Sequence, residues 1–405
     1  MKQWLNRNVW TLSWVSFLQD AASELLYPIM PVLLTSVLHA PAAIVGMIEG
    51  LAEGVAATMK LGSAWLNRFL PRKVAVFVGY GLAGLGKLII AAAGSWPIVL
   101  DGRLTDRVGK GMRSAPRDVL LLQGSDRSHR GKVVGFHRTA DTLGAVLGPA
   151  LALTLLAAFN QDIRPVLWFA VIPATLSTLL VLAVKDHEPR ASRKGAADNS
   201  PAPAATAASA PDDSAAVAPA KAEPLPARLK AVLGLIAGFA FLNFPDALVL
   251  LHVSQIGFSL SSVVGAYLLY NLAYAALNFP FGWLSDKLRP SAIYAIGLLC
   301  FAIAYGGMSL TRDHTLTLVL LVVYGGFAAA NDTVGKSWVS KLAPESRQLW
   351  AQSLLQGLSG FGVLAAGLWA GALWTIGGGS GNLPLLISGG AALIAAVVLG
   401  LMGRD

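Results

Sequence analysis

Long apolar stretches follow one another along almost the whole 405-residue chain. A helix needs about 20 mostly apolar residues to cross a bilayer. Twelve stretches meet this requirement, at residues 10–37, 43–66, 74–94, 97–122, 132–158, 164–184, 229–252, 261–284, 291–311, 315–341, 349–375 and 383–402. The sequence does not show the ten-residue segments of alternating polarity that a membrane barrel needs. The pattern therefore predicts an all-α membrane protein with twelve transmembrane helices.

One segment in the middle of the chain breaks this pattern. Residues 186–227 are rich in alanine, proline and serine and offer no apolar surface to bury. Such a composition is typical of a flexible linker. It divides the chain into an N-terminal bundle of six helices at 1–185 and a C-terminal bundle of six helices at 228–405.

Lysine and arginine are distributed unevenly between the predicted loops, and this sets the orientation. If the N-terminus lies in the cytoplasm, the loops on that side hold twenty of these residues, whereas the outer loops hold only Arg164 and Arg312. We therefore expect a multi-pass protein of the bacterial inner membrane with both termini in the cytoplasm.

The composition excludes several classes of protein. Only 13% of the residues are charged, against about 25% in soluble domains. The net charge of +9 is concentrated at the ends of apolar stretches or inside them, so we expect no nucleic-acid partner. Cys300 is the only cysteine, and the sequence contains neither a GxxxxGK[ST] phosphate loop nor an HExxH motif. We expect no enzymatic activity, no metal and no cofactor.

The two halves carry related motifs in the same order. Residues 63–68 align with 282–287 at an offset of 219, and residues 106–110 match 332–336 at an offset of 226. These matches indicate a parallel repeat of six helices.

With these motifs, the sequence resembles the major facilitator superfamily of secondary transporters over nearly its whole length. Gly282-Trp-Leu-Ser-Asp286-Lys287 is similar to the family's loop after the second helix of a half, although the first-half copy carries Asn67 in place of aspartate. Gly144-Ala-Val-Leu-Gly148-Pro149 resembles the GxxxGP motif of antiporters. The stretch at 106–118 is similar to a signature of a bacterial and archaeal branch. The resemblance implies a conformational role for Asn67, Arg68, Gly144, Gly148, Pro149, Gly282 and Asp286.

Charged residues inside the predicted spans are concentrated in the first half, which holds eight acidic and eight basic ones. Each costs about 2.5–3.5 kcal/mol at the bilayer centre, so each is a functional hypothesis. At about 100° per residue, an arc of about 80° on the span at 97–122 holds Arg103, Asp106, Lys110, Arg113 and Arg117. Because this arc is unsuited to lipid, we expect it to meet the acidic residues of the first two helices, with Glu53 as the partner of Arg103.

A buried carboxylate beside a guanidinium is subject to two opposed influences on its pKa, so it can bind a proton in one conformation and lose it in another. Histidine titrates near physiological pH, and His137 lies one turn from Asp141. The resemblance places Arg103 where the family has a fourth-helix arginine linked to proton coupling. We therefore predict proton-coupling roles for Asp20, Glu24, Glu49, Glu53, Arg103, Asp106, His137 and Asp141.

Polar and aromatic residues elsewhere in the spans are candidate solute ligands: Tyr27, Lys110, Arg113, Asn243, Asp246, Tyr270, Asn271, Tyr274, Asp332 and Lys336. Cations and acids balance, so the sequence leaves the charge of the solute open. We predict a monomeric secondary active transporter that moves a small solute across the bilayer by alternating access, coupled to protons as an antiporter for efflux. The alternatives are a proton symporter or uniporter for uptake, and a receptor that does not transport.

Overall fold

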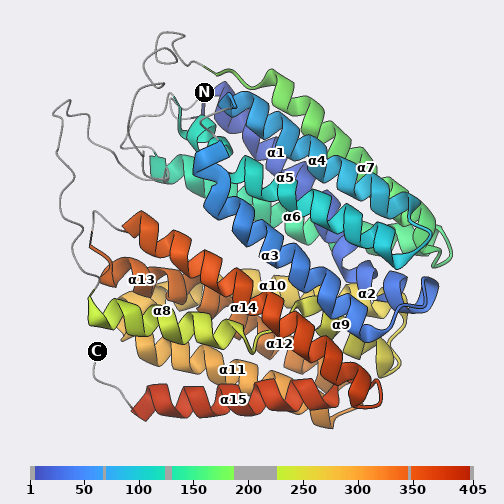
Figure 1. Cartoon of the computed structure of the whole chain (residues 1–405), viewed down its shortest axis with the longest axis vertical. Coiled ribbons are helices and arrows are strands. Elements are labelled where there is room, and N and C mark those ends of the chain that lie inside the picture. Colours follow the sequence, from blue (N-terminus) through green and yellow to red (C-terminus); the bar gives the residue numbers. More distant parts are fainter. Residues whose placement is uncertain (1–4, 67–69, 124–129, 187–225, 345–347, 402–405) are drawn as a thin grey trace.

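The computed structural model describes residues 5–66, 70–123, 130–186, 226–344 and 348–401, and within these ranges every regular element is a helix. Two stacked groups of helices run roughly along the same direction (Figure 1). The first group comprises α1 (Arg7–Leu26), η1 (Tyr27–Ile29), α2 (Met30–Val32), η2 (Leu33–Val37), α3 (Ala42–Leu66), α4 (Arg72–Ala92), α5 (Trp96–Leu122), α6 (Arg130–Ala158), α7 (Ile163–Leu180) and η4 (Val181–Ala183).

The second group comprises α8 (Ala227–Ala240), α9 (Asp246–Gln255), α10 (Leu260–Lys287), α11 (Pro290–Leu310), α12 (His314–Ala329), η6 (Ala330–Gly335), α13 (Lys336–Leu342), α14 (Gln348–Ile376) and α15 (Asn382–Leu401). The start of α1, the first helix of the chain, and the end of α15, the last, lie at the same end of the molecule, as an even number of crossings requires (Figure 1). The predicted all-α class is confirmed.

Nine helical segments in the described ranges are long and apolar enough to cross a membrane. The other three expected spans are 10–37, 97–122 and 229–252, where charged residues or helix breaks interrupt the apolar stretch. The prediction of one continuous helix over 229–252 was wrong, because the chain leaves the helix between Ala240 and Asp246. Pro245, with φ −55° and ψ 139°, begins α9, and a proline disfavours helical geometry in the residue before it.

The first helix changes type around Pro28 and Pro31. A 3-10 turn at η1 follows α1, and a π-type turn at η2 follows α2. A proline cannot donate the backbone hydrogen bond of a regular α-helix, so the hydrogen-bonding pattern of the helix changes locally around these positions. A second π-type turn, η6, lies in the predicted span at 315–341 and contains Asp332.

The two halves meet along α3 and α14. Gly46 of α3 and Gly367 of α14 lie against each other so closely that a Cβ on either residue would overlap the other's carbonyl oxygen. Small residues allow helix backbones to approach in this way within a membrane. Further contacts between the halves join α6 with α10 and α2 with α9.

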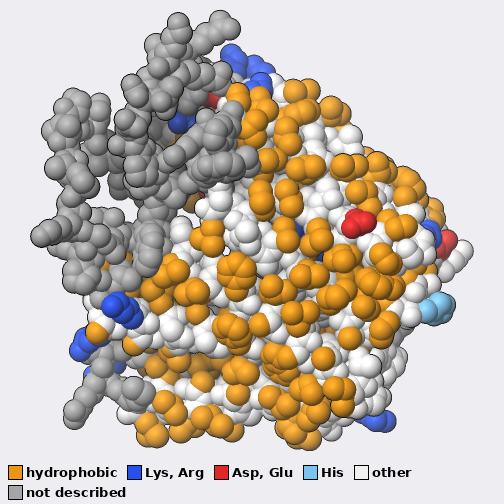
Figure 2. All heavy atoms as spheres, in the orientation of Figure 1, with side chains coloured by type: hydrophobic (Ala, Val, Ile, Leu, Met, Phe, Trp, Pro, Cys, Tyr) orange, Lys and Arg blue, Asp and Glu red, His pale blue; other side chains and the backbone are white. Residues whose placement is uncertain are grey.

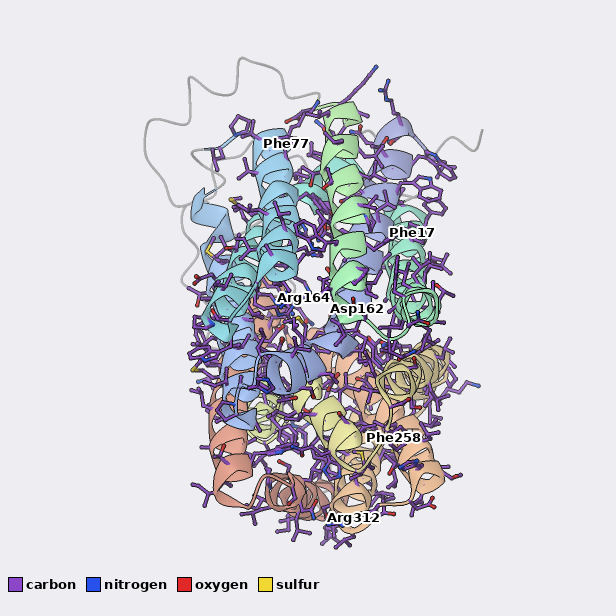
Figure 3. The ribbon with its side chains drawn as sticks, turned by 90° about the vertical axis from the view of Figure 1, so that its right-hand side faces the viewer. Phe17, Phe77, Asp162, Arg164, Phe258 and Arg312 are labelled. Carbon is purple, nitrogen blue, oxygen red and sulfur yellow. The ribbon has the colours of Figure 1, made fainter. Side chains whose placement is uncertain are left out.

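The visible outer surface is largely apolar, and most of its charged atoms lie near the edges of the view (Figure 2). Leu310, Leu316, Ile376 and Ile394 are among its exposed large side chains. Figure 3 looks from the side opposite the termini, where Asp162 and Arg164 lie in the first group and Phe258 and Arg312 in the second. An apolar surface of this extent on a helical protein is typical of contact with lipid.

Candidate functional site

Two ion pairs join α5 to α3, and one of them is made by Arg103 of the predicted charged arc. The Arg103 guanidinium donates to Glu49 in a pair that is almost completely buried, and Arg107 lies 3.2 Å from Glu53. The predicted partnership of Arg103 with Glu53 was therefore wrong. Glu49 and Glu53 are one turn apart, and the packing of α3 on α5 sets Glu49 level with Arg103.

A third pair lies between α4 and α5. Lys87 Nζ donates to Asp106 Oδ1 at 2.9 Å, and both side chains are at most 6% exposed. Arg107 approaches the other Asp106 oxygen at 3.8 Å. Asp106, a predicted proton-coupling residue, is thus held between two cations. Arg113, a predicted solute ligand on the same helix, is buried with its guanidinium over the Tyr80 ring at 4.2 Å.

Glu24 connects the two halves. The Tyr267 hydroxyl of α10 donates a hydrogen bond of 2.6 Å to Glu24 Oε2 of α1. The rings of Tyr27 and Tyr267 pack at 5.4 Å, and the Arg103 guanidinium lies 5.7 Å from the Tyr27 ring. The predicted acidic and aromatic residues of the first helix therefore lie at a contact between the halves, beside the Glu49–Arg103 pair.

The two acidic residues among the predicted solute ligands of the second half are held in different ways. Asp246 accepts a 2.6 Å hydrogen bond from Tyr324, which stacks on Tyr270 at 5.1 Å. Asp332 is paired with Lys336 and accepts a 3.0 Å hydrogen bond from Tyr274. The predicted ligands Asp332, Lys336 and Tyr274 therefore lie together, and Tyr270 lies near Asp246.

The remaining two predicted solute ligands of the second half, Asn271 and Asn243, differ in their hydrogen bonding. The Asn271 amide donates to the Tyr267 carbonyl within α10 at 3.1 Å. Asn243 lies in the break between α8 and α9, and its buried Oδ1 has no hydrogen-bond partner among the described residues.

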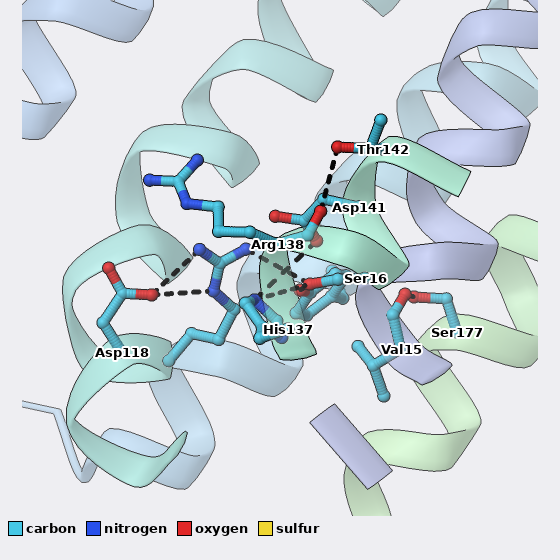
Figure 4. Close-up of polar contacts among 10 residues, drawn as sticks. Val15, Ser16, Asp118, His137, Arg138, Asp141, Thr142 and Ser177 are labelled. Carbon is cyan, nitrogen blue, oxygen red and sulfur yellow. Dashed lines mark hydrogen bonds and ion pairs between the residues drawn. The ribbon is translucent and has the colours of Figure 1, made fainter. Parts of the chain in front are cut away.

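A polar cluster occupies the contact of α1 with α5 and α6 (Figure 4). Ser16 lies 3.4 Å from His137 Nε2 and accepts a hydrogen bond of 3.2 Å from Arg117, which also donates to Asp118. His137 Nε2 lies 3.7 Å from Asp141, as the spacing of one turn predicted. The structure therefore brings His137 and Asp141 together.

The two glycines of the GxxxGP motif bring α6 against the acidic turns of α1. A Cβ on Gly144 would lie 2.5 Å from the Phe17 carbonyl oxygen and 3.2 Å from Asp20 Cβ. A Cβ on Gly148 would lie 2.7 Å from the Ala21 carbonyl oxygen. Pro149 follows inside α6. The motif therefore fixes the backbone position of the turns that carry Asp20 and Glu24.

Gly148→Val should lower stability, because three added carbon atoms must displace the backbone of α1. Overpacking of this kind costs about 1–3 kcal/mol. We expect a lower melting temperature in detergent than for wild type, whereas Gly390→Val, at a glycine with open space around its Cβ position, should melt like wild type. Equal melting temperatures for the two variants would contradict the close α1–α6 contact.

Four of the predicted conformational residues fall where the structure gives little detail. Asn67 and Arg68 lie outside the described residues. Gly282 and Asp286 lie within α10, but the side-chain surroundings of Asp286 are outside what is described. Their conformational role stays a prediction.

Four hydroxyl groups in these contacts were not among the predicted site residues: those of Ser16, Tyr80, Tyr267 and Tyr324. Tyr267 lies three residues before the candidate Tyr270, on the neighbouring part of the same helix. Tyr324 lies in a strongly apolar stretch and gives no local signal beyond its hydroxyl. A buried tyrosine hydroxyl usually has a hydrogen-bond partner, and this general rule is the only sequence signal that favours a polar contact for Tyr324.

A family model described as Major Facilitator Superfamily matches residues 12–270 and 231–405. The chain belongs to the Major Facilitator Superfamily. An uncharacterized MFS-type transporter of Methanocaldococcus jannaschii is 27% identical over 402 residues, which are 98% of this chain and 94% of that protein. This membrane protein is therefore a transporter of the MFS type.

Solved structures of other superfamily members share the fold of this MFS transporter. The nucleoside transporter NupG matches with a TM-score of 0.75 and 13% identity, covering 99% of this chain and all of that one. The human organic anion transporter TETRAN matches with a TM-score of 0.63 and 19% identity, covering 97% of this chain and 99% of that one. At these identities the likeness concerns the fold alone.

Proposed function

We propose that this MFS transporter exports a small solute across the inner membrane in exchange for protons, with both termini in the cytoplasm. The observation that carries the proposal is the hydrogen bond from Tyr267 to Glu24, which joins the two halves. Among the described residues, the Glu24 carboxylate belongs to no ion pair, unlike Glu49 and Glu53. Glu24 is therefore a carboxylate whose surroundings depend on how the halves meet.

Alternating access requires the halves to separate at their outer end. Gln161, in the loop after α6, accepts a 2.8 Å hydrogen bond from Ser261 at the start of α10, so this end is closed by contacts from both halves. Opening it moves α10 away from α1 and breaks the hydrogen bond between Tyr267 and Glu24. The carboxylate then meets water from outside and exchanges a proton there. When the halves close again, the carboxylate is buried and accepts the Tyr267 hydrogen bond, so the open and closed arrangements hold it in different surroundings and differ in how readily it binds a proton.

The contact between α6 and α1 supports the exchange of solute for protons rather than passive flow of solute through a channel. Gly144 and Gly148 hold α6 against the turns of Asp20 and Glu24. A change of protonation at these acidic residues therefore acts directly on a tightly packed helix pair, and packed interfaces respond by switching between discrete arrangements. The resemblance of this motif to that of antiporters is the basis for proposing efflux.

Glu24→Gln should uncouple solute movement from protons. We would first identify a solute by thermal stabilisation of the purified protein at pH 6 and pH 8, since a ligand of the folded state raises its stability. In proteoliposomes with that solute, wild type should export against a gradient only when an inward proton gradient is imposed. Glu24→Gln should still exchange solute for solute, but the proton gradient should no longer drive it.

Tyr267→Phe is the matched control, because it removes the hydroxyl and keeps the carboxylate. Because the carboxylate that binds the proton remains, the proton gradient should still drive export, but less effectively than in wild type, since the hydrogen bond that distinguishes the two arrangements is lost. Wild-type flux that does not depend on the pH gradient would refute proton coupling, and movement of solute and protons in the same direction would replace antiport by symport.

A further inference from the structure

One buried histidine of the second half lies between two backbone carbonyl groups. His252, in the last turn of α9, is 1% exposed. Its Nδ1 lies 2.9 Å from the carbonyl oxygen of Ser380, in the loop between α14 and α15. Its Nε2 lies 3.0 Å from the carbonyl oxygen of Met308, in the last turn of α11. A single imidazole ring therefore connects three segments of the second half, and the proposed export mechanism does not use it.

The number of hydrogen bonds that His252 makes depends on its protonation. A carbonyl oxygen only accepts, so each ring nitrogen must carry a hydrogen atom to bond it. The neutral ring carries one such hydrogen atom and bonds only one of the two carbonyl groups, while its other nitrogen points a lone pair at an acceptor. The imidazolium ring carries two and bonds both. Binding of one proton therefore adds one hydrogen bond, either to α11 or to the loop.

The surroundings of the ring act on its charge in opposite directions. Burial disfavours the imidazolium, and no carboxylate of the described residues lies within ion-pair distance of His252. The ring lies at the C-terminal ends of α9 and α11, where helix dipoles favour a cation and the last carbonyl groups have no helical donor. These favourable contacts act together only while the loop is in place. Proton binding and attachment of the loop therefore support each other.

Few other charged groups surround this ring. The helices α11, α14 and α15 and residues 377–381 contain no aspartate, glutamate, lysine, arginine or histidine. Asp246, at the other end of α9, is about 9 Å away along the helix axis at 1.5 Å per residue. The titratable residues of α11 are neutral at physiological pH: Tyr294, Cys300 and Tyr305. The charged and titratable residues that follow α11 are exposed: Arg312, Asp313 and His314. A pH-dependent change at this contact is therefore attributable to His252 itself.

The loop that carries the Ser380 carbonyl group is shaped to cover Trp374. The Trp374 ring is fully buried and lies 6.3 Å from the His252 ring. A Cβ on Gly381 would overlap the Trp374 ring, and Gly381 has a φ of 70°, which glycine adopts without strain. The loop therefore has a defined position against Trp374, and in that position its carbonyl group reaches His252.

The histidine contact lies at the end of the second half that is opposite the termini. Figure 3 looks at this end, where Phe258, three residues after α9, and Arg312, two residues after α11, are labelled. From α9 the chain passes through residues 256–259 into α10, whose Ser261 donates to Gln161 of the first half. The attachment of α9 therefore bears on the segment that closes the outer end.

We propose that His252 is a proton-binding site at the external end of the second half, and that a bound proton joins α9, α11 and the loop at 377–381. The bound proton steadies the connection from α9 to α10 and favours the closed outer end, since that connection leads to the contact of Ser261 with Gln161. The inference rests on the proposed function only in taking this end as the external one. It requires neither Glu24 nor a particular solute.

The test uses the purified full chain in detergent, in which both ends meet the same pH. Histidine labelled with nitrogen-15 reports the state of each ring by its chemical shifts, and His252→Gln identifies the signals of His252. From pH 8 to pH 5, the His252 ring should pass from one protonated nitrogen to two. Over the same range, amide hydrogen exchange of residues 377–381, corrected for its intrinsic pH dependence, should slow about tenfold or more in wild type, as for one hydrogen bond to a charged group. In His252→Gln it should not slow.

His39→Asn is the matched control, because His39 is exposed in the loop before α3 and has a φ of 52° that asparagine also adopts. It should keep the wild-type response. The proposal is overturned if the His252 ring keeps the same protonation from pH 8 to pH 5, if exchange of the loop does not slow, or if it slows equally in His252→Gln. Glu24→Gln should retain the response, so a failure of proton-coupled export would leave this result standing.

Discussion

Arg103→Ala is expected to abolish transport and to destabilise the protein strongly. Arg103 is the cation that faces Glu49, and the Glu49 side chain is only 2% exposed. Removal of one partner from a buried pair leaves the other charge without compensation, which costs about 3–5 kcal/mol. The same substitution removes the guanidinium that lies over the Tyr27 ring, next to the contact of Tyr27 with Tyr267. We expect a large fall in melting temperature and no solute flux in proteoliposomes.

The double variant Glu49→Gln with Arg103→Met separates the two effects. It removes both charges, so it should recover much of the stability that Arg103→Ala loses. If Arg103 acts in the transport cycle, this stable variant should still fail to couple solute to protons. Flux at the wild-type rate in either variant would remove Arg103 from the mechanism.

The sequence predicted helix positions well because membrane insertion depends on local composition. The expected span at 349–375, for example, differs by one residue at each end from α14, Gln348–Ile376. The break between α8 and α9 was missed because hydropathy does not register backbone geometry. Phe241, Leu242 and Phe244 are apolar and extend the apolar run, although α8 ends at Ala240 and α9 starts only after Pro245.

The pairing of charges could be predicted only in part. Helical spacing placed the charges of the span at 97–122 on one arc, and we expected this arc to meet acidic residues of the first two helices. It did not show their relative height, because one helical turn of about 5.4 Å separates Glu49 from Glu53. The contact of α3 with α5 sets that height, and it depends on packing along both helices. The hydrogen bond from Tyr267 to Glu24 spans 243 residues and has no local signature.

Lys87→Ala is expected to destabilise the protein about as strongly as Arg103→Ala. The side chains of Lys87 and Asp106 are 2% and 6% exposed, and their charged atoms lie 2.9 Å apart. The variant leaves the buried Asp106 carboxylate without this lysine. Its remaining cation is Arg107, which lies 3.8 Å away and is shared with Glu53. The loss of one partner should again cost about 3–5 kcal/mol, which is a large part of the total stability of a typical protein. We expect little folded protein after purification, measured as the monodisperse fraction in detergent.

Replacing both partners, as in Lys87→Met with Asp106→Leu, decides what the pair does. Apolar residues of similar volume often replace a buried ion pair at no net cost in stability, so this variant should fold. If it also transports at the wild-type rate with the same dependence on the proton gradient, the pair only holds α4 on α5. If it folds but no longer responds to the gradient, Asp106 belongs to the proton-coupling residues, because folding without the charge shows that packing alone does not require it.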